Sequence, residues 1–221
     1  MPLLVDAEQT WLQPAIDGLV LRLSRTHNRE YPIVYNTFQM YLKDSTERLE
    51  QYIALADTEG HLPCVKLVRG AYMQSEGERC KENGRPYPVH DSIEATHECY
   101  NNAALALIDR LDTCGLLIAS HNQTTVEKAV ERLLDAGHAS DHPNLAFGQL
   151  YGMADHLSFA LGSNKFNICK YVPFGPIREV IPYLVRRLEE NASILGGTPY
   201  ERSLLWKELR RRRIGFSITH S

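Results

Sequence analysis

The chain has 221 residues, of which 43% are hydrophobic and 23% are charged, with a formal net charge of -3. This composition is ordinary for a soluble globular protein, and the weak negative charge gives no reason to expect a nucleic-acid partner. No apolar run approaches the roughly 20 residues that a membrane-spanning helix needs. The five cysteines are scattered and form no CxxC pair, which argues against a disulfide scaffold or a structural zinc site and favours a reducing compartment.

Short strand patterns alternate with helical patterns from the start of the chain. The first strand candidate, Leu3 to Val5, stops at Asp6, and a helical pattern opens at Ala7-Glu8 and runs to Leu23. The second candidate, 32–39, is followed by a helix over 45–56. Both strands are rich in apolar or β-branched residues and end in a polar residue, as expected of strands in an α/β protein.

The middle of the chain continues this plan with one long interruption. A third strand candidate covers 64–72, and a fourth, 116–119, leads into a helix over 124–136. Between them, the segment 81–88 contains Gly84, Pro86 and Pro88 and is expected to be a loop. A helix over 92–111 follows this loop.

Two further strands and two further helices are expected in the last third. The remaining strand candidates cover 144–150 and 167–172, and a helix is expected over 182–191. The segment 201–213 predicts an amphipathic helix that covers the domain or meets a partner. Six strand-helix units indicate a parallel sheet with right-handed crossovers.

Polar residues gather at the carboxyl ends of the expected strands, where a (βα)8 barrel keeps its active site. Six strands do not close such a barrel, and no linker to a second domain is present. We therefore expect one α/β domain over 1–221, with the strands and helices of an incomplete, distorted TIM-type barrel in 1–197 and an amphipathic helix and tail in 198–221.

An arginine pair marks the helix expected over 182–191. Tyr183, Arg186, Arg187 and Glu190 stand at i, i+3, i+4 and i+7 and so share one helical face. Two guanidinium groups can hold a carboxylate or phosphate bidentately. A solvated charged face is the alternative.

Other candidate groups lie at strand ends. Lys66 and Arg69 are followed by Gly70-Ala71, which would permit close approach of a ligand to the backbone. Solvated cations at an edge strand, or a Schiff base on Lys66, are the alternatives. His121 stands at a strand mouth with no second ligand at metal-binding spacing, so no metal site is expected. Asp6 could pair with a cation, act as a base or cap a helix.

Two glutamines complete the set of candidate groups. Gln39 and Gln149 offer neutral donors and acceptors that suit the edge of a heterocycle. GxGxxG, GxxxxGK[ST], HExxH and GxSxG are all absent, so Rossmann, P-loop, zincin and serine-hydrolase interpretations lose their main support.

Several motifs jointly resemble proline dehydrogenase. The resemblance rests on the order and spacing of these segments, some of which are typical of the eukaryotic mitochondrial branch: 4–8 (LVDAE), 38–41 (FQMY), 66–72 (KLVRGAY), 119–122 (ASHN), 147–153 (FGQLYGM), 170–176 (KYVPFGP), 183–187 (YLVRR) and 201–206 (ERSLLW). It implies a distorted (βα)8 barrel that holds FAD and oxidises L-proline to Δ1-pyrroline-5-carboxylate by hydride transfer to flavin N5, with electrons passed to a membrane quinone.

The resemblance also implies roles for individual residues. Arg186 and Arg187 would clamp the substrate carboxylate, braced by Glu190, and Tyr183, Tyr171 and Leu150 would wall the substrate ring. Asp6 and Lys66 would be catalytic, with Lys66 at the flavin N5 edge. The positions implied for cofactor binding are Ala7, Gln39, Lys66, Arg69, Gly70, Ala71, Ser120 and His121. Serine at 120 replaces a commoner threonine, and Met73 stands where bacterial relatives have tryptophan.

The resemblance further implies a location on the matrix side of the mitochondrial inner membrane, with peripheral membrane contact, although no targeting segment is read from this chain. The family has two more strands and a clamp lysine before the strand that ends at Asp6, so the chain is expected to be the C-terminal part of the barrel. Hydroxyproline dehydrogenase, or a non-catalytic truncated fragment of the same barrel, are the alternatives.

Overall fold

A computed structural model describes residues 1–192, 203, 206–207 and 209–210, with no side chain described from 186 to 192. The helix expected over 201–213, the tail after it and the boundary expected at 197 therefore lie largely outside the described residues. The account below concerns the described part of the chain.

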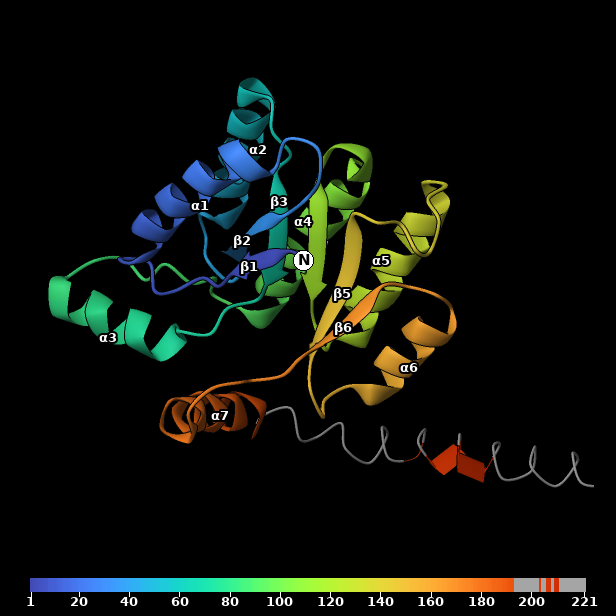
Figure 1. The fold of residues 1–221 in the computed structure, drawn as a ribbon. Helices are drawn as coiled ribbons and strands as arrows, with labels where there is room; N and C mark the ends of the chain where they lie inside the picture. Colours follow the sequence, from blue (N-terminus) through green and yellow to red (C-terminus); the bar gives the residue numbers. More distant parts are fainter. Residues whose placement is uncertain (193–202, 204–205, 208, 211–221) are drawn as a thin grey trace, which may run out of the picture.

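Six parallel strands form one sheet, in the order in which they occur in the chain. The strands are β1 (Leu3–Val5), β2 (Val34–Gln39), β3 (Cys64–Val68), β4 (Gly115–Ala119), β5 (Leu145–Leu150) and β6 (Ile168–Tyr171). The sheet curls, and helices lie along its outer side (Figure 1). Within the described ranges β1 and β6 do not pair with each other, so the sheet is an open part of a barrel. The expected α/β fold with six strands is confirmed.

Seven α-helices and one 3₁₀ turn connect and follow the strands within the described ranges. They are α1 (Gln13–His27), α2 (Ser45–Glu59), α3 (Met73–Asn83), α4 (Ile93–Ile108), the turn Leu111–Thr113, α5 (Gln123–Asp135), α6 (Asp155–Ser163) and α7 (Ile177–Ala192). None of the described helices is long and apolar enough to cross a membrane.

Helix α1 begins six residues later than the position expected from its apolar pattern, at Gln13 and not at Ala7. Pro14 stands in its first turn, where a missing backbone N–H costs nothing. The residues before it make specific contacts, because Glu8 donates its N–H to Gln13 Oε1 at 2.9 Å and accepts at its carbonyl from Gln39 Nε2 at 2.8 Å. The non-helical segment between β1 and α1 therefore stays at the carboxyl edge of the sheet.

Helix α3 was not expected, and its last residues, 81–83, overlap the expected loop. Its apolar pattern is weak, and tertiary contacts stabilise it. The buried carboxylate of Glu76 accepts from the backbone N–H of Thr10 at 2.6 Å and from its hydroxyl at 2.7 Å. The guanidinium of Arg79 lies 4.3 Å from the ring centre of Trp11. The helix ends at Gly84, whose φ of 59° is left-handed.

The main hydrophobic core lies between the sheet and its outer helices. Alternate strand residues such as Leu67, Ile118 and Phe147 point into it and pack against α4 and α5. The inner face carries a smaller cluster of Tyr35, Cys64 and Leu117. Lys66 follows Cys64 on that same inner face, so polar groups replace apolar ones toward the carboxyl ends of the strands.

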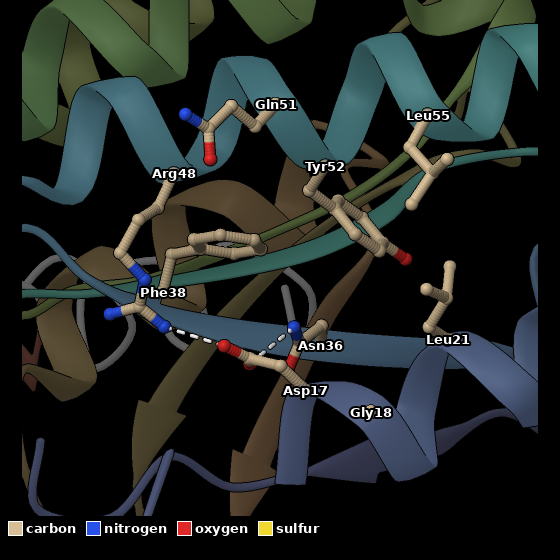
Figure 2. Close-up of a pocket in the computed structure, with 9 residues that line it drawn as sticks. All are labelled: Asp17, Gly18, Leu21, Asn36, Phe38, Arg48, Gln51, Tyr52 and Leu55. Carbon is tan, nitrogen blue, oxygen red and sulfur yellow. Dashed lines mark hydrogen bonds and ion pairs between the residues drawn. The ribbon is translucent and has the colours of Figure 1, made fainter. Parts of the chain in front are cut away.

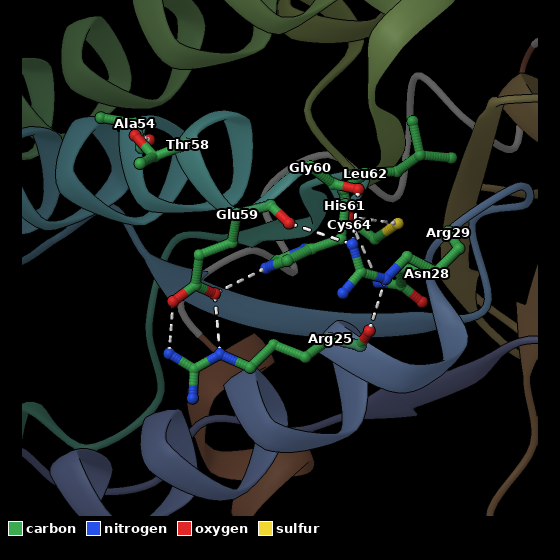
Figure 3. A network of polar contacts seen from close by, with 10 residues as sticks. All are labelled: Arg25, Asn28, Arg29, Ala54, Thr58, Glu59, Gly60, His61, Leu62 and Cys64. Carbon is green, nitrogen blue, oxygen red and sulfur yellow. Dashed lines mark hydrogen bonds and ion pairs between the residues drawn. The ribbon is translucent and has the colours of Figure 1, made fainter.

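Side chains at the amino-terminal ends of the strands form a structural network (Figure 3). Asn28 donates to the carbonyl of Val34 at 2.8 Å and accepts from the N–H of the same residue at 2.8 Å. Arg25 binds Glu59 through two nitrogens, and the buried His61 lies 3.4 Å from the same carboxylate. These contacts tie α1 and α2 to the start of β2 and β3, at the end of the sheet opposite to the polar strand ends.

A cavity of about 230 Å³ lies between α1 and α2 on the outer face of β2 (Figure 2). Its only carboxylate, Asp17, accepts from Arg48 at 2.6 Å, from Asn36 at 2.9 Å and from Gln13 at 2.8 Å. Because protein groups already surround this carboxylate, it holds the two helices to the strand and leaves little for a ligand.

Candidate active site

Asp6 and Lys66 meet at the carboxyl edge of the sheet although 60 residues separate them in sequence. Lys66 Nζ donates to Asp6 Oδ1. The lysine side chain is 13% exposed and the aspartate side chain 58% exposed, so the cation is the more deeply placed partner. A cation fixed in this way suits the stabilisation of developing negative charge better than nucleophilic attack through a Schiff base.

Ala7 and Gln39, the last residue of β2, are both buried. The amide of Gln39 donates to the carbonyl of Glu8 at 2.8 Å, so one of its donors serves to hold the segment after β1. Ala7 lies in this segment, directly after Asp6. The structure thus brings four of the predicted positions, Asp6, Ala7, Gln39 and Lys66, to one part of the strand edge.

Arg69 occupies a junction of four elements. Its Nε donates to His97 Nδ1 in α4, its Nη1 to Ser120 Oγ after β4, and its Nη2 to Thr125 Oγ1 in α5, each at 2.9 Å. The guanidinium also lies 4.5 Å from the ring centre of Tyr100. Three hydrogen bonds in its plane and one aromatic ring against its face therefore hold the guanidinium in one orientation.

This guanidinium has no carboxylate partner within the described part of the chain, and its protein hydrogen-bond partners are all neutral. Burial lowers its pKa. The first turn of α5, which begins beside Thr125, adds the positive end of a helix dipole. A partly buried cation without a counter-ion, beside a helix N-terminus, is suited to bind a phosphate or another anion.

Packing within the protein explains why residue 70 is a glycine. Its φ is +144°, and a Cβ added to it would lie 2.3 Å from the ring of Tyr41. The small residue is therefore required by packing against the protein itself, and close approach of a ligand here stays a prediction. Ala71 follows it on the same loop and is half-buried.

Ser120 and His121 both serve internal contacts. Ser120 Oγ accepts from Arg69 and from the N–H of Asn122 at 3.1 Å. His121 Nε2 accepts from the N–H of Leu150 at 2.9 Å. Burial, with smaller contributions from Lys170 and Arg69, lowers the pKa of His121 to about 4. The imidazole is thus neutral at physiological pH and links the ends of β4 and β5.

The predicted substrate wall lies at the last two strands. Leu150 is opposite Tyr171 in the pairing of β5 with β6. The rings of Tyr171 and Tyr183 are 5.5 Å apart at an angle of 44°. Arg186, Arg187 and Glu190 belong to α7, which confirms the expected helix, but their side chains lie outside the described residues. The clamp therefore stays a prediction.

The side-chain amide nitrogen of Gln149 is buried without a hydrogen-bond acceptor among the described residues. It is 2% exposed, its Oε1 accepts from Ser158 Oγ and, at 3.4 Å, from Lys170 Nζ, and its Nε2 has no partner among the described protein atoms. A buried amide donor without a partner is uncommon in folded proteins. This glutamine is therefore a further polar group with spare hydrogen-bonding capacity near the carboxyl end of β5.

Sequence reasoning singled out Ser120 but none of the other residues around Arg69. His97, Tyr100 and Asn101 stand at i, i+3 and i+4 in α4, so they share the face that meets β3 and β4. Asn101 Oδ1 accepts from Thr125 Oγ1 at 2.8 Å. Three polar or aromatic residues at this spacing, on a helix that otherwise packs alanines and leucines into the core, were the signal in the sequence.

The structure gathers one cluster of metal-ligating residue types in its described part, at the end of the sheet opposite to Lys66. It consists of Asp112, His138 and His142. Nδ1 of His142 accepts from the N–H of Asn144 at 3.3 Å, which places the proton of a neutral ring on Nε2, 3.6 Å from Asp112. The contacts of His142 are those of a turn-stabilising residue.

The chain is similar in sequence to known proteins along most of its length. A family model described as proline dehydrogenase matches residues 1–198. Human mitochondrial proline dehydrogenase 1 is 44% identical over 214 residues, which are 95% of this chain and 36% of that protein. Hydroxyproline dehydrogenase from Bos taurus is 43% identical over 220 residues, which are 96% of this chain and 48% of that protein. The chain thus spans less than half the length of these relatives.

Solved structures show the same fold. Proline utilization A from Bdellovibrio bacteriovorus, inactivated by N-propargylglycine, matches with a TM-score of 0.78 and 26% identity over 86% of this chain and 20% of that one. A mutant of Bradyrhizobium japonicum proline utilization A gives a TM-score of 0.76 with 28% identity over 87% of this chain and 20% of that one. The strands and helices described above therefore form part of a TIM-type barrel.

Proposed function

Since the chain belongs to the proline dehydrogenase family, we propose that it carries the cofactor-binding and substrate-binding part of an enzyme that oxidises L-proline to Δ1-pyrroline-5-carboxylate. The cofactor proposed is FAD, which supplies a hydride acceptor at N5 of its flavin ring. The final electron acceptor proposed is a membrane quinone. The proposal extends to the mitochondrion, named for several relatives, and to peripheral contact with the matrix side of the inner membrane.

Arg69 is the observation that carries the proposal. It presents a guanidinium that is fixed by neutral partners, lacks a counter-ion within the described residues and adjoins the N-terminus of α5. A flavin nucleotide brings a phosphate that would supply the missing negative charge. In this proposal Arg69, Ser120 and the start of α5 hold the phosphate-bearing arm, and Gly70, Ala71 and His121 lie beside the ring.

Lys66 and Asp6 are proposed as the catalytic pair. Lys66 would hold its positive charge at the edge of the flavin ring where negative charge develops during substrate oxidation. Asp6 fixes the direction of that ammonium through the ion pair. Ala7 and Gln39 would shape the site near the pair, because Ala7 directly follows Asp6 and Gln39 holds the same segment through Glu8, and both residues are buried.

The substrate is proposed to bind toward β6 and α7. Tyr171, Tyr183 and Leu150 would exclude water from the faces of the pyrrolidine ring, and the contact between the two tyrosine rings supports this arrangement. Arg186 and Arg187 would hold the carboxylate, with Glu190 fixing their orientation. Since proline carries no phosphate or nucleobase, its carboxylate is the group that a pair of arginines can recognise.

A hydroxyproline substrate is the second candidate, because the hydroxyproline dehydrogenase of Bos taurus is nearly as similar to this chain as the human proline enzyme is. The two substrates share the carboxylate and the ring nitrogen and differ in one hydroxyl. Discrimination would therefore arise at the residues around the ring and not at the arginine pair.

The experiment mixes the FAD-loaded protein anaerobically with L-proline and, separately, with hydroxyproline, and follows flavin absorbance. Bleaching by proline with a higher kcat/KM than for hydroxyproline is expected. Bleaching by hydroxyproline alone would assign the second substrate. Flavin that binds but is reduced by neither substrate would overturn the oxidation proposal. A chain that retains no flavin at all would identify it as a non-catalytic fragment of the barrel.

A further inference from the structure

We propose that His97 is a positioning residue, which fixes the guanidinium of Arg69 so that it presents its free N–H groups to the flavin phosphate. This inference rests on the proposed function, since it assigns the phosphate as the ligand of Arg69. His97 itself touches no substrate and acts only through Arg69. It lies in α4, 28 residues after the arginine in sequence.

The protein uses three of the five N–H groups of Arg69. A guanidinium has five N–H groups, one on Nε and two on each terminal nitrogen. His97 takes the one on Nε, while Ser120 and Thr125 each take one on a terminal nitrogen. One N–H on each of Nη1 and Nη2 is left over. These two N–H groups are available to donate to phosphate oxygens.

The bond to Nε sets the direction of the fork. The hydroxyls of Ser120 and Thr125 hold the two terminal nitrogens, and each has one further hydrogen bond, from the N–H of Asn122 and to Oδ1 of Asn101 respectively. The His97 ring is a planar acceptor with one lone pair on Nδ1, and its backbone is held within the 16-residue helix α4. Tyr100, one turn further along the same helix, confines the guanidinium plane at 4.5 Å. Without His97, the Nε–H group would have no hydrogen-bond partner among the described residues, and the direction of the fork would depend on the two hydroxyls and the Tyr100 ring alone.

The protonation state of His97 is consistent with this task. Accepting from Arg69 requires an unprotonated Nδ1, so the neutral ring carries its proton on Nε2. Burial and then the charge of Arg69 lower the pKa of His97, while Glu94 on the same helix opposes this shift. The ring therefore stays an acceptor through neutral pH and does not place a second cation against Arg69.

The test compares FMN with riboflavin, which lacks the phosphate, by fluorescence titration of the whole chain. His97→Leu is expected to reduce the preference for FMN over riboflavin about tenfold, the effect of losing one hydrogen bond to a charged group. His97→Asn is expected to restore most of it, because its Oδ1 stands where Nδ1 stood. An unchanged preference in His97→Leu, together with a lost preference in Arg69→Gln, would overturn the inference.

A second measurement does not depend on flavin. In the free protein, the Nε–H resonance of Arg69 is expected to exchange slowly with water in the wild type and in His97→Asn, and to disappear through fast exchange in His97→Leu. Equal protection in His97→Leu would overturn the positioning role. If Arg69→Gln leaves the FMN preference unchanged while this resonance behaves as expected, the phosphate assignment in the proposed function fails and the Arg69–His97 link stands.

Discussion

The ammonium of Lys66 and the carboxylate of Asp6 join the ends of β3 and β1, which are not neighbours in the sheet because β2 lies between them. The contact passes over Thr37, which is opposite Lys66 in the pairing of β2 with β3 and whose hydroxyl donates to the carbonyl of Val5 at 2.7 Å. Three strand ends are thus fixed relative to one another around one cation.

Replacing that cation is expected to slow flavin reduction without unfolding the protein. Lys66→Met keeps the aliphatic stem but removes the charge at the flavin edge, and we expect a reduction rate about 10²- to 10³-fold lower. The measurement is anaerobic stopped-flow reduction of the flavin by saturating L-proline. Lys128→Met, at an exposed position of α5, is the matched control and should react at the wild-type rate. Equal rates for the two variants would remove Lys66 from the catalytic pair.

Gly70→Ala is expected to be strongly destabilising. The new Cβ would lie 2.3 Å from the Tyr41 ring at a φ of +144°, so backbone strain and overpacking combine to roughly 3 kcal/mol. Gly84→Ala shares the positive φ but meets nothing within 4 Å, and should cost only about 1 kcal/mol. Urea unfolding of both variants measures the difference. Similar losses would mean that the Tyr41 ring moves aside readily.

Tyr100→Phe isolates a buried hydroxyl. The hydroxyl shares its hydrogen between the carbonyls of Leu67 and Ala119, at 3.0 and 3.2 Å. Its loss leaves both carbonyls without this donor, and we expect the free energy of unfolding to fall by about 1 to 2 kcal/mol. The phenyl ring still stacks on Arg69, and the FMN preference should be kept. Tyr151→Phe, whose side chain is 73% exposed, should unfold at the wild-type urea concentration. A lost FMN preference in Tyr100→Phe would show that the hydroxyl also orients Arg69.

Stability is expected to fall in weak acid because of His121. Its pKa is about 4 in the folded protein and 6.5 without burial, so between these values the unfolded state binds a proton that the folded state does not. The stabilisation is complete above about pH 6.5 and is lost as pH falls toward 4, by up to about 3 kcal/mol. Urea unfolding at pH 7 and 4.5 should show a smaller pH effect in His121→Gln than in the wild type. His27→Gln, at an exposed position, should match the wild type.

Periodicity predicted the strands well because each one combines a short apolar run with a polar end. It failed for α3, whose helix is held by contacts of Glu76 and Arg79 with a segment more than 60 residues earlier. It also began α1 too early, because the apolar pattern continues through a non-helical segment that hydrogen bonds hold at the sheet edge. Contacts of this range are invisible to a local pattern.

In the site, as in the fold, some residues could be predicted from local sequence and others could not. Strand-end positions placed Asp6, Lys66, Arg69 and His121 at the correct edge of the sheet. The sequence did not reveal that the Tyr41 ring also requires a glycine at position 70, because the approach of that ring depends on a loop conformation. His97 was missed because it lies inside a helix, where a single histidine carries no signal until its neighbours at i+3 and i+4 are considered together.

The order of the strands in the sheet determines when each part of the site can form. Every strand pairs with its sequence neighbours, so units can be added one at a time as the chain is synthesised, and contacts of very long sequence separation are few. The Arg69 junction needs only β3, α4, β4 and α5, a continuous stretch that ends at Asp135. The end of the site that we propose to bind the phosphate can therefore assemble before the tyrosines of β6 and α7 have left the ribosome.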